Sequence, residues 1–150
     1  MANSIRENIL AKVKTSMEAL TGVGTVQRMR VTPLDNEVAF PAVFIFEDRE
    51  EISTQAPSDM GKVYKNLFVT LQCWEIDDGS GTSVQLNELM KNVEIKAMSN
   101  PNWDSLALDT IPIETRNFID LSSVKGEGYL GFEFDIKIRY RHTFYDPETA

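Results

Sequence analysis

The chain contains one histidine and one cysteine, His142 and Cys73, the two residue types that most often take part in nucleophilic catalysis. Any Ser-His-Asp or Cys-His arrangement would have to use His142, because the nucleophile needs a base beside it. Cys73 alternates with Val69 and Leu71, which is typical of a small buried apolar residue. One Cys and one His cannot supply the ligands of a zinc site. We therefore predict no catalytic residue and no metal centre, and we expect the protein not to be an enzyme.

Two glycine-containing segments have the composition of calcium or phosphate loops. Residues 77–81 read DDGSG, but they lack the ligand spacing and closing Glu of an EF-hand, and no Gly-Lys-Ser/Thr follows them. Residues 22–24 read GVG and follow a predicted helix, whereas a dinucleotide-binding turn follows a strand. Turn composition explains both segments. We expect no cofactor.

Length and charge limit the class of protein and its partners. A chain of 150 residues predicts a single domain, residues 1–150. A net charge of −8 argues against a protein that binds nucleic acid. No run approaches about 18 uninterrupted apolar residues, and the first residues lack the apolar run of a signal peptide. We therefore expect no membrane span, synthesis in the cytoplasm, and no internal disulfide with only one cysteine.

Hydrophobic periodicity predicts an α+β domain. Apolar residues recur every three or four positions in residues 4–20 and 83–98, which predicts two amphipathic helices. Ser4 is placed to cap the first helix and Glu7 to close its capping box. Strands are expected at residues 25–32, 42–47, 63–75, 106–119 and from 130 onward. The order α-β-β-β-α-β-β predicts a mostly antiparallel sheet with both helices packed on one face.

The last predicted strand has the most regular alternation in the chain. Every second residue from Leu130 to Tyr140 is apolar, so one face of the strand should be buried under the helices. The positions between them are charged, and the sheet should keep a second, charged face. These charged residues are Glu133, Asp135, Lys137, Arg139 and Arg141.

A long acidic loop is predicted between the second and third strands, at about residues 48–61. The acidic residues at and within it are Glu47, Asp48, Glu50, Glu51 and Asp59. Connections of this length without structure of their own are uncommon in compact domains unless they are functional or disordered. A solvated loop and a functional loop are both open interpretations.

Five segments together carry a family resemblance. In chain order they are SIRENILAKVKTSMEAL, FPAVFIFED, LFVTLQCWEIDD leading into VQLNELMKNVEIKAM, NPNW, and GYLGFEFDIKIRYRHTFY. In the order and spacing of these segments, over nearly its whole length, the chain resembles the tail terminator proteins of long-tailed bacteriophages, also called tail completion proteins. No chemical signature is involved in this resemblance.

The resemblance implies a structural subunit of the virion, assembled in the host cytoplasm. Such subunits form a ring, commonly of about six copies, on the head-proximal end of the tail tube, where the ring stops tube polymerisation and offers a surface to the neck proteins. Six copies at −8 each would surround a negative channel through which DNA passes without specific binding. The acidic loop is then a candidate to line the channel or contact the tube protein. The candidates for pairing with a neighbouring subunit are Arg28, Arg30, Lys137, Arg139 and Arg141.

Two further interpretations stay open. A head–tail connector protein of the neck would share much of this layout. From a different class, the chain would be a monomeric α+β ligand-binding module or a small enzyme, with Trp74 and Trp103 as the wall of a pocket.

Overall fold

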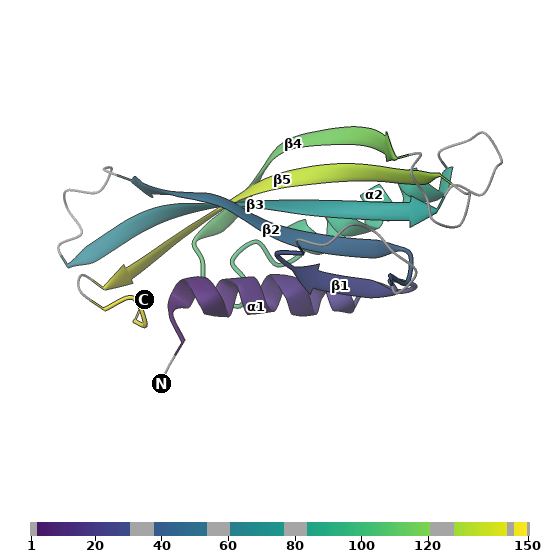
Figure 1. Cartoon of the computed structure of the whole chain (residues 1–150). Helices are drawn as coiled ribbons and strands as arrows, with labels where there is room; N and C mark the ends of the chain where they lie inside the picture. Colours follow the sequence, from purple (N-terminus) through teal and green to yellow (C-terminus); the bar gives the residue numbers. More distant parts are fainter. Residues whose placement is uncertain are drawn as a thin grey trace.

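The computed structural model describes residues 3–30, 38–53, 61–76, 84–120, 128–143 and 146–149 of the chain. Figure 1 shows a twisted sheet with two helices against it. The elements in chain order are α1 (Ile5–Glu18), β1 (Thr25–Arg28), β2 (Ala42–Ser53), β3 (Lys62–Ile76), α2 (Val84–Met98), β4 (Asp109–Asp120) and β5 (Tyr129–Thr143). The predicted order of elements and the α+β class are confirmed.

The strands form one sheet in the order β1-β2-β3-β5-β4 (Figure 1). Of the neighbouring pairs among the described strands, β1 and β2 run parallel and the others are antiparallel. The last strand in the sequence therefore lies inside the sheet, between β3 and β4, while β4 lies at the edge. As expected for a strand containing Pro112, β4 is irregular at that point, with a register shift between Pro112 and Glu114.

Both helices pack on the same face of the sheet, and the main core lies between them and the strands. Each helix buries the apolar stripe that its sequence predicts, and β3 and β5 supply every second residue from their helix-facing side. Each fully buried aliphatic side chain contributes about 1.5–3 kcal/mol to this packing. The core residues from the strands include Leu67, Val69, Leu71, Cys73, Phe132, Phe134, Ile136 and Ile138.

Of the two contacts predicted at the N-terminus of α1, the structure contains the Ser4 cap. The Ser4 hydroxyl accepts a hydrogen bond from the backbone N–H of Glu7 at 3.2 Å. The capping box is wrong, because the Glu7 carboxylate instead accepts two hydrogen bonds from Arg28 of β1, at 2.6 and 3.1 Å. A charge-assisted bidentate pair is stronger than a bond to a backbone N–H. The Arg28 guanidinium also holds the pKa of Glu7 below its usual range.

The predicted acidic loop is wrong over its first half. Strand β2 continues to Ser53, and residues 49–53 pair with β3 opposite residues 64–68. A β-bulge between Glu47 and Arg49 places Glu50 opposite Leu67 on the helix side. The strand extends because the long alternating β3 offers it a continuous partner. Asp59 and the turn at 77–81 lie outside the described residues.

Two other strand boundaries differ from the prediction. Strand β1 ends at Arg28, before Met29, whose φ of 50° lies in the left-handed region. Strand β4 begins at Asp109 rather than 106, because residues 103–105 have positive φ and form a tight turn after α2. This turn brings Trp103 into the core.

Candidate interaction face

The face of the sheet opposite the helices, called the outer face below, carries the charged residues that alternate along β5. Within the described residues both helices lie on the other face. One end of the outer face is covered by an aromatic cluster, which includes Phe40 and Val38 from the segment before β2. The members of this cluster are Val38, Phe40, Ala42, Phe44, Phe46, Trp74, Ile76, Phe118 and Tyr129.

The middle of the outer face is a ladder of ion pairs and hydrogen bonds between strands. Arg116 of β4 contacts Glu133 at 2.7 Å and Asp135 at 2.8 Å on β5. The Thr70 hydroxyl of β3 donates to Asp135 at 2.6 Å, and Gln72 donates to Glu133 at 3.1 Å. The two acidic residues of β5 therefore have partners on both neighbouring strands, which the alternation within one strand could not reveal.

Arg139 of β5 forms an ion pair with Asp109 at the start of β4. Its Nε donates to Asp109 Oδ1 at 2.6 Å, and a second hydrogen bond joins Nη2 to Oδ2, so the pair is bidentate. The Arg139 guanidinium lowers the pKa of Asp109 below its usual value, and the carboxylate in turn raises the pKa of Arg139. This pair fixes the end of β4 against β5.

The lowered pKa of Asp109 gives a testable pH dependence. Its stabilisation is present above the unfolded pKa, near 3.8, and is lost as the pH falls through the lower folded pKa. At neutral pH we expect Asp109→Asn to reduce the free energy of unfolding by about 0.2–1 kcal/mol, the range of exposed pairs. The difference should shrink below about pH 4, measured by denaturant unfolding across a pH series. Arg139→Gln should show the same loss and the same pH dependence, and a difference that persists at pH 2 would contradict the assignment.

The structure places Glu47 and Glu50 on the helix side of β2, where they hold α1 to the sheet. Glu47 contacts Arg6 at 2.9 Å and Arg28 at 3.3 Å. Glu50 contacts Arg6 at 3.4 Å and accepts a hydrogen bond from the Tyr140 hydroxyl at 2.6 Å. Burial and this carboxylate raise the pKa of Tyr140. These residues act within the chain as a bridge between layers.

The other predicted contact residues lie around the sheet. Asp48 and Glu51 both pair with Arg49, at 3.8 and 3.4 Å, and the Arg49 guanidinium stacks over the ring of Phe68. Arg30 lies over the ring of Phe44, at 5.3 Å from its centroid. The four predicted acidic residues that the structure describes, Glu47, Asp48, Glu50 and Glu51, therefore do not form one cluster.

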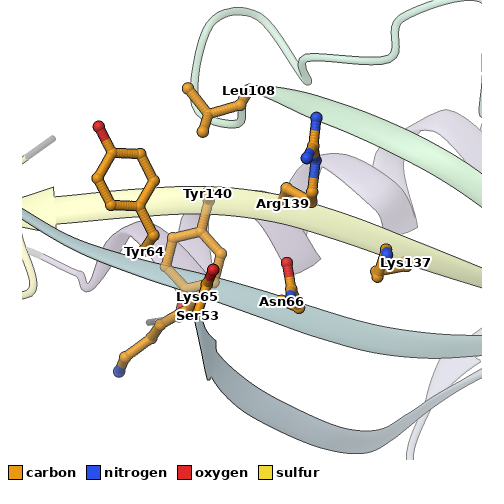
Figure 2. Close-up of a pocket in the computed structure, with 8 residues that line it drawn as sticks. All are labelled: Ser53, Tyr64, Lys65, Asn66, Leu108, Lys137, Arg139 and Tyr140. Carbon is orange, nitrogen blue, oxygen red and sulfur yellow. The ribbon is translucent and has the colours of Figure 1, made fainter. Parts of the chain in front are cut away.

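Near the far end of the outer face is a hollow of about 300 Å³. Figure 2 shows its lining, with Asn66 of β3 lying between Tyr64 and Lys137, and Leu108 on the turn just before β4. Asn66 is short and lies opposite Arg139 in the register of β3 and β5. The lining residues are Ser53, Tyr64, Lys65, Asn66, Leu108, Lys137, Arg139 and Tyr140.

Sequence reasoning identified Lys137 and Arg139 but missed the hollow itself. A weak signal was present, because a short polar residue, Asn66, stands between the aromatic residues Tyr64 and Phe68 at alternate positions of one strand. The other side of the hollow comes from Leu108, about 40 residues away along the chain and 45% exposed. No local pattern brings these segments together.

The predicted tryptophan pocket wall is wrong. Trp103 is fully buried in the core on the helix side, whereas Trp74 belongs to the aromatic cluster of the outer face. Cys73 is buried as expected, and burial raises the pKa of its thiol well above the usual value. His142 is also buried, with Nδ1 at 2.8 Å from the carbonyl oxygen of Thr143.

Within the described ranges, no group of three or more His, Cys, Asp or Glu side chains has the arrangement of a metal site. Neither of the described helices is long and apolar enough to cross a membrane. Comparison with known proteins identifies no family model and no curated relative that matches this chain.

Proposed function

We propose that the protein is a structural subunit of a long-tailed bacteriophage that forms a ring, of about six copies, on the end of the tail tube. In this role it stops tube polymerisation and provides the surface on which the neck of the head is joined. The proposal rests on the resemblance in element order and on the α+β fold, in which two helices cover one face of a mostly antiparallel sheet.

The observation that carries the proposal is the mixture of charged and exposed apolar side chains on the outer face. In the described residues, this face has an acidic middle, around Glu133 and Asp135, and a hollow with basic residues near one end. Aliphatic side chains are also exposed beside it, with Leu108 at 45% and Ile113 at 50%. Charged and apolar groups that lie together on an uncovered sheet are suited to contact with another protein surface.

Charge is consistent with the passage of DNA through such a ring. A ring of six copies, each with a net charge of −8, is strongly negative. A negative channel through this ring would repel DNA phosphates and so would not retain DNA. The partners under this proposal are further copies of the chain, the tail tube protein and a neck protein. The place of the protein is then the head-proximal end of the tail in the virion.

The test of this function is capping of purified tail tubes. We expect the protein to be found by negative-stain imaging at one end of each tube, and to block further addition of tube protein in a polymerisation assay. Light scattering over a range of concentration and salt measures whether the ring forms before it meets the tube. Preferential binding to the head portal, with tubes left uncapped, would instead identify a neck connector. A monomer that binds neither would overturn the proposal.

A further inference from the structure

On the outer face, the hollow over Asn66 is lined by two basic residues of β5, Lys137 and Arg139. Lys65 also borders the hollow, but it lies on the helix-facing side of β3, and the lining residues that the structure describes include no Asp or Glu. The charge of Arg139 is matched by Asp109, and Lys65 contacts Glu50 at 3.2 Å.

Lys137 differs from these two cations. Among the residues that the structure describes, it has no hydrogen bond within 3.5 Å and no ion pair within 4.0 Å. Its charge acts at longer range on Asp109, where it helps to lower the pKa of that carboxyl. The hollow therefore contains one ammonium group whose hydrogen-bonding capacity the described part of the fold leaves to an incoming group.

We propose that the hollow binds a carboxylate side chain from the acidic surface of a second copy of this chain. This inference deepens the proposed function, on which it rests, by assigning a contact between neighbouring subunits. The Lys137 ammonium supplies charge and up to three N–H donors, and the Asn66 amide supplies a neutral donor beside it. The exposed Leu108 forms an apolar rim that partly shields the pair from water.

Charge complementarity favours a second copy as the occupant. Each copy carries 23 acidic and 15 basic residues, so two copies repel unless unlike charges meet at the contact. In a head-to-tail ring, two different surfaces of the same chain come together. Lys137 in the hollow of one copy and one of the excess carboxylates of the next copy satisfy this geometry.

Nucleic acid is a poorer fit to the same face. Phosphate backbones are bound by several cations in a row. Among the described lining residues one ammonium group is available, and the acidic residues Glu133 and Asp135 lie farther along the same strand. These carboxylates would repel the neighbouring phosphates.

The experiment uses one variant that changes the charge of the hollow and another that reduces its volume. Lys137→Glu reverses the charge that would bind the carboxylate, and Asn66→Phe fills the hollow without changing any charge. Lys91→Glu is the matched control, because Lys91 lies on α2 on the opposite face of the sheet, where it pairs with Glu88 at 2.7 Å. Circular dichroism and the thermal midpoint establish that each variant is folded.

Self-association is measured by light scattering at low and high salt, alone and with purified tail tubes. We expect Lys137→Glu and Asn66→Phe each to weaken assembly about tenfold or more, and Lys91→Glu to change it less than about twofold. High salt should weaken wild-type assembly and reduce the difference between wild type and Lys137→Glu.

The outcomes separate this inference from the proposed function. If rings still form and cap tubes with both variants at wild-type strength, the hollow is not the contact, while the proposed function stands. An effect of Lys137→Glu without an effect of Asn66→Phe would also overturn it, because the carboxylate would then bind outside the hollow. Binding of a labelled DNA oligonucleotide that is lost in Lys137→Glu, with self-association unchanged, would assign the hollow to nucleic acid. A protein that never self-associates, with or without tubes, would overturn both proposals.

Discussion

Replacing Trp103 by alanine is expected to lower the free energy of unfolding by about 3–5 kcal/mol, the range measured when large core side chains are truncated. The Trp103 side chain is fully buried in the core between the helices and the sheet. Its Nε1 donates a hydrogen bond to the Thr110 hydroxyl at 2.8 Å, and that hydroxyl donates to the carbonyl oxygen of Pro101 at 2.7 Å. The substitution leaves a cavity and removes a donor from this buried chain of bonds. Denaturant unfolding followed by circular dichroism measures the effect.

Trp103→Ala should also disturb the hollow on the outer face of the sheet. Thr110 is adjacent to Asp109, whose carboxylate holds Arg139, so loss of Trp103 loosens the start of β4. Ile95→Ala is a suitable control, because Ile95 is 61% exposed on α2 and its truncation should change stability by no more than about 0.5 kcal/mol. A loss of less than about 1 kcal/mol for Trp103→Ala would show that the indole is not packed in the core.

Replacing Gly131 by valine is expected to reduce stability by about 1–3 kcal/mol through overpacking of the aromatic cluster. Gly131 lies on β5 between Trp74 of β3 and Phe118 of β4, which are its partners in the register. The rings of Trp74 and Phe118 meet edge to face, with centroids 4.5 Å apart. A Cβ at position 131 would lie 2.4 Å from Phe118 Cε2 and 3.0 Å from Trp74 Cε3. The residue is glycine because the two rings take the space of its side chain.

A compensating change makes this prediction specific. Phe118→Ala removes the ring that a valine at 131 would strike, so the double variant should be more stable than the sum of the two single effects predicts, by about 1 kcal/mol. The free energies of unfolding of the four proteins give this coupling energy. Near-ultraviolet circular dichroism of the tryptophans should change in Gly131→Val. Strictly additive effects would show that residue 131 and Phe118 do not compete for space.

Local pattern was sufficient for the elements that bury one face. The three- and four-residue spacing of apolar side chains in residues 4–20 and 83–98 predicted both helices, and the alternation after Leu130 predicted β5 and its two faces. The apolar pattern repeats about every turn in a helix and every two residues in a strand, so a short stretch of sequence is enough to predict the element and its buried face. The class and the order of elements follow from the same patterns. A hydroxyl at the start of α1, Ser4, was also enough to predict its cap.

Tertiary structure alone decided what the charged residues contact. The position of β5 between β3 and β4 gives Glu133 and Asp135 partners on both sides. Pairing with β3 extends β2 where the sequence suggested a loop, and the bulge in β2 turns Glu50 toward α1 and Tyr140. The hollow combines segments from β2, β3, β5 and the turn before β4. Cross-strand partners and the walls of a cavity depend on register between distant segments, which a periodicity within one segment does not encode.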